Sequence, residues 1–322
     1  MRKYLILFSF ALLCACGPRG GKGVSDAPAR REFPAVDVPS MYSDPQERVG
    51  YAAGHFWDRF TDTAKVYVCD SVTVNGVPVA EVESQMGLFT TLLGELPKDA
   101  AAQAVTRLFD RVDAFERKFP DSNVFEELGR LTRHYLYDPN SPVRNEDLYF
   151  YFVDRLGRSD LIDNGYRKGY EWDARMCSLN RVGTPAADFS FTDTRGRVRT
   201  LYGIKAEHTV LIFGNPGCKA CQEIMVDMES TPEISALIDS GRLQVVDIYI
   251  DQDLDDWKDH IPEYPAKWIN GYDHNYTIRT DLIYNVRGIP SIYLLDAEKT
   301  VLLKDATPER VLTALANLSV PG

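Results

Sequence analysis

Two cysteines separated by two residues are the strongest chemical signal in this sequence. Cys218 and Cys221 follow a short apolar run, residues 209–213, and open a segment that is predicted to be helical before Pro232. In the first turn of a helix, residues i and i+3 lie on one face, close enough for a disulfide. The free N–H groups of that turn and the positive end of the helix dipole favour a thiolate. The pattern therefore predicts a dithiol/disulfide centre, with Cys218 as the nucleophile and Cys221 as its resolving partner.

Two other interpretations of the cysteine pair remain open from the spacing alone. Lys219 adds a cation that would stabilise a thiolate, which favours the redox interpretation. A zinc site would need two further ligands, and neither Cys69 and Cys177 nor the five histidines offer a pair at ligand spacing, so no metal is expected. A structural disulfide is the plainer alternative. The sequence does not decide whether Cys69 and Cys177 pair with each other.

Composition and charge limit the classes of function. A chain of 322 residues can hold two domains, and 44% hydrophobic with 26% charged residues is typical of globular proteins. The net charge of −11 argues against nucleic acid as a partner and against attraction to anionic lipid.

The first residues resemble a bacterial lipoprotein signal. A short basic region precedes an apolar stretch, residues 4–13, which is too short to span a bilayer. The sequence LCACG, residues 13–17, resembles the box in which the last cysteine becomes the lipidated N-terminus. By this resemblance residues 1–15 are removed and Cys16 is acylated. The mature protein is then expected to be lipid-anchored in the cell envelope, facing the periplasm or the surface, and Gly17 favours the outer over the inner membrane.

A helical domain is predicted to follow this anchor. Residues 16–40 are rich in Gly and Pro and are expected to form a flexible tether. Over residues 41–180 six segments carry apolar residues at helical spacing, which predicts an all-α domain. An Asn75-Gly76 pair indicates one tight β-hairpin within it. The aromatic run 149–152 has the helical spacing of a core, and this favours packing over a binding surface.

Strands and helices alternate in the remaining residues, 181–322, which predicts an α/β domain. The fold class is therefore α+α/β. The expected elements are a hairpin over 189–201, buried strands at 209–213 and 243–250, helices at 222–229 and 254–260, an irregular stretch through 284, strands at 289–295 and 300–303, and a last helix at 309–318.

Residues 183–322 resemble the thioredoxin family, in particular the membrane-tethered TlpA/ResA-type thiol–disulfide oxidoreductases of the bacterial envelope. The motifs that carry the resemblance are the opening Pro185 to Leu201, the Cys-Lys-Ala-Cys centre and Arg287-Gly-Ile-Pro-Ser291, in family order. The preceding domain resembles an uncharacterised helical domain of envelope lipoproteins from Bacteroides-type bacteria, through residues 56–60 and 135–142. That second resemblance implies an architecture and no activity.

The resemblance implies a substrate site as well as a reaction. In the family, the proline corresponding to Pro290 is cis and packs beside the two cysteines, and the residue before it, here Ile289, pairs with an extended peptide. Gly217 occupies a substrate-contact position where the family usually has Trp. The implied activity is exchange with protein thiols and disulfides, without a cofactor, supplied by an electron donor, and as a reductant rather than an oxidant. The competing interpretation is a non-catalytic, lipid-anchored binding or scaffold protein with a structural disulfide.

The sequence departs from the family where a buried acid usually serves the second cysteine. Ile224 stands where the TlpA/ResA type has Glu, and Ile212 stands near the position of the buried Asp of ordinary thioredoxins. Ala220 also replaces a frequent Pro. The acid is therefore missing, shifted, or supplied by Asp247 or Asp251.

Overall fold

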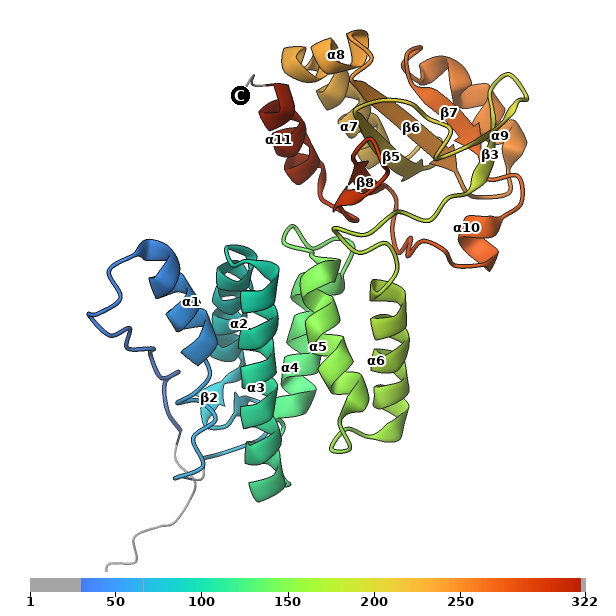
Figure 1. Ribbon diagram of the computed structural model, residues 1–322. Coiled ribbons are helices and arrows are strands. Elements are labelled where there is room, and N and C mark those ends of the chain that lie inside the picture. Colours follow the sequence, from blue (N-terminus) through green and yellow to red (C-terminus); the bar gives the residue numbers. More distant parts are fainter. Residues whose placement is uncertain (1–29, 66, 320–322) are drawn as a thin grey trace, which may run out of the picture.

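The structure is a computed structural model that describes residues 30–65 and 67–319. A helical domain is followed by a mixed α/β domain, which lies above it in Figure 1, and this confirms the predicted fold class. The predicted signal segment and Cys16 lie outside the described residues. Within the described ranges, no helix is long and apolar enough to cross a membrane.

The N-terminal domain is built from six α-helices and one π-helical turn in the described part of the chain. Polar side chains cap the helices where the sequence offers them: Asp44 accepts the N–H groups of Gln46 and Glu47, and Asn145 accepts that of Leu148. The helical elements are α1 (Pro45–His55), α2 (Val79–Gly94), α3 (Lys98–Lys118), α4 (Val124–Thr132), the π-helical turn η1 (Arg133–Tyr137), α5 (Glu146–Arg158) and α6 (Asn164–Cys177).

The predicted hairpin is present between α1 and α2. Its strands are β1 (Thr73–Val74) and β2 (Val77–Pro78), and they pair antiparallel. Asn75 and Gly76 have φ of 46° and 81°, the left-handed backbone that a tight two-residue turn of this kind requires.

Residues 30–40 differ from the tether that we expected, because they pack against the helical domain. Arg31 donates its N–H to the carbonyl oxygen of Gly76 at 2.8 Å. The ring of Phe33 lies 5.2 Å from both Trp57 and Phe60, centroid to centroid. The Gly- and Pro-rich composition does not reveal this packing, because it depends on the individual contacts of Arg31 and Phe33.

The aromatic run on α5 divides between core and surface. Tyr149 and Phe152 are fully buried, as the helical spacing predicts. Phe150 and Tyr151 are only partly buried, and the guanidinium of Arg181 lies 4.2 Å from the centre of the Phe150 ring. The aromatic run therefore packs into the core on one side and against Arg181 on the other.

The C-terminal domain is a seven-stranded sheet with strand order β4-β3-β7-β6-β5-β8-β9. β6 pairs parallel with β5 and β7, and the other pairs are antiparallel. The strands are β3 (Ser190–Asp193), β4 (Val198–Thr200), β5 (His208–Gly214), β6 (Leu243–Tyr249), β7 (Ile269–Tyr272), β8 (Ser291–Leu295) and β9 (Val301–Leu303), and the helices are α7 (Lys219–Ser230), α8 (Pro232–Asp239), α9 (Leu254–His260), the 3₁₀ turn η2 (Ile261–Glu263), α10 (Thr277–Thr280) and α11 (Pro308–Ser319).

Helices α7, α8 and α11 cover one face of this sheet (Figure 1). The apolar cluster on that face joins Ile224 and Met228 of α7 to Leu243 and Val245 of β6. Because side chains alternate along a strand, the next residue of β6 on this face is Asp247. The packing therefore directs a carboxylate toward the layer that contains α7.

Four elements of this domain were not predicted. The turn η2, strand β7 and helix α10 fall in the stretch that we expected to be irregular, and α8 follows Pro232 as a second helix after α7. β7 contains Asn270 and Gly271, which have low strand propensity, and it forms because β3 and β6 pair with it on either side.

Candidate active site

The two cysteines lie at the start of α7, as the spacing predicts. Cys218 is the N-cap of the helix, and the N–H of Cys221 points to its sulfur at an N–S distance of 3.2 Å. The two residues form a disulfide, with their Cα atoms 5.2 Å apart. Cys218 is half-buried, whereas Cys221 is 4% exposed. Only the first sulfur is therefore open to a partner, and the helix N-terminus acts on it.

The loop before β8 lies directly against Cys218. The Ile289–Pro290 peptide bond is cis, and the carbonyl oxygen of Ile289 lies 3.9 Å from the Cys218 sulfur. In the described chain, neither the N–H nor the carbonyl of Ile289 makes a backbone hydrogen bond. An incoming extended peptide could use both groups. The structure thus brings Cys218, Cys221, Ile289 and Pro290 together, and the roles given to them above stay predictions.

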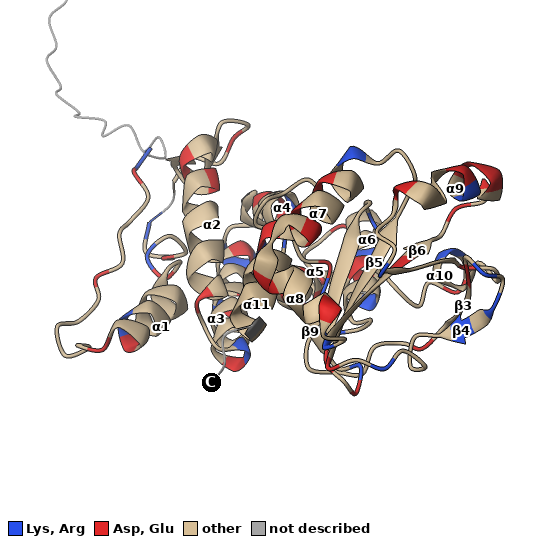
Figure 2. Cartoon of the chain, turned by 90° about the horizontal axis from the view of Figure 1, so that it is seen from above, with Lys and Arg blue, Asp and Glu red and all other residues tan. Residues whose placement is uncertain are grey.

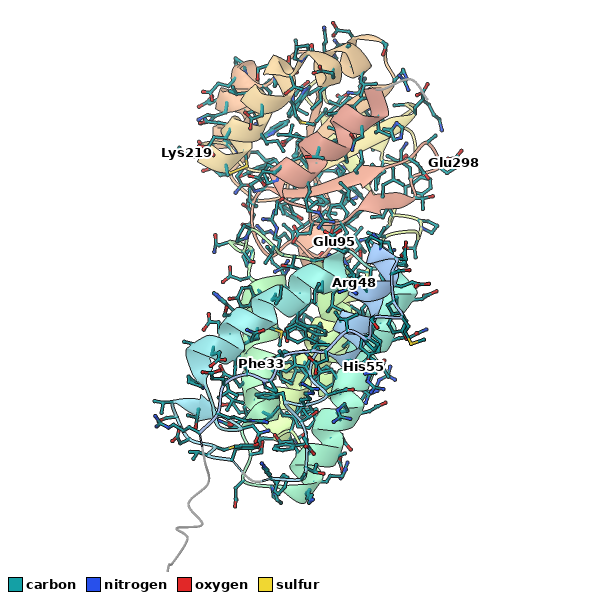
Figure 3. The ribbon with its side chains drawn as sticks, turned by 90° about the vertical axis from the view of Figure 1, so that its left-hand side faces the viewer. Phe33, Arg48, His55, Glu95, Lys219 and Glu298 are labelled. Carbon is teal, nitrogen blue, oxygen red and sulfur yellow. A yellow bond between two sulfur atoms is a disulfide. The ribbon has the colours of Figure 1, made fainter. Side chains whose placement is uncertain are left out.

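Gly217 and Lys219, which flank Cys218, both face solvent. Gly217 is exposed with φ of +70°, a backbone conformation that favours glycine, and a Cβ added there would meet no atom within 4 Å. The Lys219 side chain is 89% exposed, and its ammonium lies 3.4 Å from the carboxylate of Glu223 (Figure 3). In this arrangement Lys219 is paired with an acid of its own helix, which weakens its field at the sulfur.

Asp247 is a buried acid on β6, which pairs with β5, the strand that leads into the cysteine loop. It lies opposite Ile212 in the parallel pairing of β5 and β6, one strand away from the position where the family has its buried Asp. Its carboxylate lies beside Gly214 at the end of β5, since a Cβ added at Gly214 would come within 2.9 Å of an Asp247 oxygen. Burial raises the pKa of Asp247 from 3.8 to about 7. Of the open alternatives for the acid, this geometry favours Asp247.

Asp251 is already engaged in other interactions. One carboxylate oxygen accepts a hydrogen bond from Asn215 at 2.5 Å, and the other lies 2.6 Å from the guanidinium of Arg279. These contacts tie the loop after β6 to the loop before Cys218 and to α10. Asp251 therefore supports the loop, and both of its carboxylate oxygens are already engaged.

Asp305, which follows β9, contacts residues on both sides of the cis-proline. Asp305 accepts a hydrogen bond from Ser291 at 2.7 Å and binds Arg287 at 2.6 Å. The helical domain adds Glu146, which accepts a hydrogen bond from Asn285 and lies 3.7 Å from Arg287. Sequence reasoning missed Asp305 and Glu146, because neither belongs to a motif and the contacts span 14 and 139 positions.

The two other cysteines that the structure describes form no second centre. Cys69 and Cys177 are both unpaired, and Cys177 is buried with its sulfur 3.7 Å from Glu146. Burial raises the pKa of the Cys177 thiol, which keeps it protonated. Across residues 30–65 and 67–319, no three His, Cys, Asp or Glu side chains cluster as metal binding would require.

Comparison with known proteins gives relatives for both domains. Residues 17–171 match the model of a domain of unknown function, DUF5106. A thioredoxin-like protein from Bacteroides caccae, known from its crystal structure, is 32% identical with a TM-score of 0.76, over 88% of this chain and 98% of that protein. No curated protein is significantly similar.

Two further solved structures match less than half of this chain. The C-terminal domain of an uncharacterized protein from Bacteroides fragilis is 44% identical, over 42% of this chain and 98% of the other, with a TM-score of 0.41. The thioredoxin domain of a thiol–disulfide oxidoreductase from Bacteroides vulgatus is 20% identical, over 44% and 99%, with a TM-score of 0.39.

Proposed function

We propose that this chain, which belongs to the family of thioredoxin-like proteins, is a thiol–disulfide oxidoreductase that exchanges its Cys218–Cys221 pair with cysteines of other proteins. The observation that carries the proposal is the position of Cys218. Its sulfur is accessible at a helix N-terminus, lies 3.9 Å from the Ile289 carbonyl, and has a buried partner three residues away. A structural staple needs none of these three properties.

The reaction proceeds in two exchanges. In the reduced form, the Cys218 thiolate attacks one sulfur of a substrate disulfide, forms a mixed disulfide and expels the other substrate sulfur as a thiolate. Cys221 then loses its proton and attacks the Cys218 sulfur, which restores the internal disulfide and releases the second substrate thiol. Two electrons pass from the chain to the substrate. An electron donor must then reduce the Cys218–Cys221 disulfide before the next cycle.

Asp247 is assigned as the acceptor of the Cys221 proton. It is buried on the sheet face that α7 covers, and a pKa of about 7 lets it accept and return a proton near neutrality. The Asp247→Asn variant is expected to slow release of the mixed disulfide and to flatten its pH dependence between pH 6 and 8. Attack by Cys218 on a small disulfide should change little.

The direction and the location are also part of the proposal. The TlpA/ResA-type motifs favour a reductant, and the lipoprotein-like residues 13–17 favour a lipid-anchored envelope protein, with the outer membrane preferred. Equilibration of the Cys218–Cys221 pair with glutathione gives the potential that decides direction. A Cys16→Ala variant should move the protein out of the membrane fraction if Cys16 is the anchor.

Trapping tests the central claim. The Cys221→Ala variant cannot resolve a mixed disulfide, so protein partners should accumulate on Cys218 and separate under reducing conditions. Cys218→Ala is the matched control and should trap none. If the first variant traps nothing and the purified chain reduces no protein disulfide with any donor, the chain is a lipid-anchored binding protein with a structural disulfide.

A further inference from the structure

A cavity of about 680 Å³ lies where the helical domain meets the loop before Pro290. We call it the junction pocket. One wall comes from η1 and the residues after it, a second from Trp172 and Asp173 of α6, and a third from Asn285 and Arg287 of the α/β domain. No single domain forms it, so it exists only in the two-domain chain.

The junction pocket adjoins the redox site through Pro139 and Gly288. Pro139 lines the pocket, and a Cβ added at Gly288 would lie 2.8 Å from the Pro139 Cβ. Gly288 precedes Ile289, whose carbonyl faces the Cys218 sulfur. An extended polypeptide rises about 3.3 Å per residue. A partner segment that pairs with Ile289 therefore brings its neighbouring side chains to the mouth of the pocket.

The pocket wall is rigid because its aromatic side chains are stacked. Tyr137 lies between the ring of Tyr149, at 4.3 Å, and the guanidinium of Arg287, at 3.9 Å. The Tyr149 hydroxyl donates to Asp173 at 2.9 Å. The turn that supplies Arg133 and Tyr137 is π-helical, a rare geometry that is frequent at functional sites.

Several charged side chains in the wall already have partners. Arg287 binds Asp305 and lies 3.7 Å from Glu146, although its buried Nε and Nη1 make no hydrogen bond to any described residue, and Arg130 binds Glu127 at 2.5 Å. The Asp138 carboxylate accepts the N–H of Asn140 at 2.8 Å and closes a turn.

Arg133 is an exposed cation of the wall that is only partly compensated. Its side chain is 58% exposed, and among the described residues its only ion pair is with Asp173, at 3.3 Å. Asp173 is itself 4% exposed, and burial raises its pKa, so it balances Arg133 only in part. His134 lies beside Arg133 in the same wall and is exposed. The wall therefore carries three arginines, Arg130, Arg133 and Arg287, against the carboxylates of Asp138 and Asp173, in a chain whose net charge is −11 and whose α9 is strongly acidic (Figure 2).

From this juxtaposition we propose that the junction pocket binds an acidic side chain of the partner protein, a few residues from the cysteine that exchanges with Cys218. The proposal rests on the proposed function and adds a substrate class to it: extended segments with Asp or Glu near the reactive cysteine. Arg133 makes a charged hydrogen bond to that carboxylate, and Tyr137 and Trp172 pack beside it. The helical domain is then the substrate-selecting part of the enzyme.

Binding of matched peptides tests the proposal independently of turnover. Fluorescent peptides carry Ser in place of the reactive Cys, with a single Glu at each of three positions on either side, and Gln peptides are the matched controls. For at least one position, the full chain should bind the Glu peptide about tenfold more tightly than its Gln counterpart. Equal affinities at all six positions would overturn the proposal.

Three variants locate the effect. Arg133→Gln should abolish the preference for Glu, and Arg133→Lys should keep part of it, which separates lost charge from lost folding. Arg117→Gln is the control, since Arg117 is an exposed arginine of α3 paired with Asp113 and Asp160, and the preference should persist. A preference that survives Arg133→Gln in a folded protein would place the acid elsewhere and overturn the assignment.

Turnover of a neutral small disulfide, bis(2-hydroxyethyl) disulfide, separates this proposal from the proposed function. If the chain turns it over but shows no Glu preference, only the junction pocket proposal fails. If the Glu preference is present but no disulfide is ever turned over, the pocket is a peptide site of a binding protein, and the oxidoreductase proposal fails.

Discussion

Glu146 and Lys304 form an ion pair across the domain boundary, with 3.1 Å between Oε2 and Nζ and with the two side chains 0% and 1% exposed. The ammonium of Lys304 also donates to the carbonyls of Cys177 and Leu179 at the end of the helical domain. The same glutamate contacts Asn285 and Arg287, the residues that lead into Ile289–Pro290. The helical domain therefore holds the loop that carries Ile289 and Pro290.

Removing the charge of Glu146 should loosen this connection. Glu146→Gln leaves Lys304 buried without its anion, and breaking a buried pair from one side costs about 3–5 kcal/mol. Denaturant unfolding should show the loss, and proteolysis should reveal faster cleavage of the junction at residues 178–186. The exposed pair of Arg117 with Asp160 is the comparison, since solvent screens it and Arg117→Gln should leave unfolding almost unchanged. Similar losses for both variants would contradict a special role for the buried pair.

The protonation of Asp247 should appear as a pH dependence of stability. Its pKa is raised from 3.8 to about 7 by burial, so the folded chain holds this proton after the unfolded chain has released it. Stability is then lost as the pH rises from about 4 to about 7. At 1.36 kcal/mol per pKa unit, the loss is roughly 4 kcal/mol.

Asp247→Asn isolates this effect from other buried acids. Asn does not titrate, so the free energy of unfolding of the variant minus that of the unaltered protein should rise by roughly 4 kcal/mol between pH 4 and pH 8. Val245→Ala, a buried position of the same strand, is the comparison and should show no such rise, because it removes no titrating group. A flat difference for Asp247→Asn would mean that the carboxylate is ionised in the folded protein.

Sequence patterns predicted the parts of this molecule that depend on local periodicity. The helices of the N-terminal domain, the Asn75-Gly76 hairpin and the buried strands β5 and β6 all have local signals, and the cysteine spacing placed Cys218 at a helix start. β7 had no such signal, because its neighbours rather than its own residues make it a strand. The sequence also carries no signal for residues that contact each other across many positions of the chain, such as Glu146 and Asn285.

For the candidate site, too, the sequence predicted the residues that belong to motifs but not those that depend on long-range contacts. The cysteines and Ile289–Pro290 are motif residues, and the structure brings them together. From the sequence, the acid could be missing, shifted, or supplied by Asp247 or Asp251, because the choice depends on which side chain the sheet buries. Glu146 and the junction pocket could not be foreseen, since both arise where two separately predicted domains meet.

Gly288 packs closely against Pro139, so a larger side chain at position 288 should disturb the contact between the two domains. Gly288→Ala places a Cβ 2.8 Å from the Pro139 Cβ, so the loop or the helical domain must shift, at a cost of about 1–3 kcal/mol. Exchange with protein disulfides should slow more than exchange with a small disulfide, which needs no partner segment across the loop.

A second substitution checks that this clash is the cause. Pro139→Gly removes the atom that Gly288→Ala meets, so the double variant should recover protein exchange relative to Gly288→Ala alone. Stopped-flow rates with both kinds of disulfide measure the recovery. Equal slowing by Gly288→Ala for both disulfides would point to a damaged redox centre and not to the domain contact.

Phe33 should contribute to the stability of the helical domain, although the sequence places it in an expected tether. Its ring contacts Phe56, Trp57 and Phe60, so Phe33→Ala removes a cluster of aromatic contacts and should cost about 3 kcal/mol. Met41, which is 79% exposed in the same segment, offers the matched control, and Met41→Ala should stay within about 0.5 kcal/mol of the unaltered protein. Thermal and denaturant unfolding of the full chain measure both. Indistinguishable stabilities would show that residues 30–40 do not hold the domain together and serve only as a spacer.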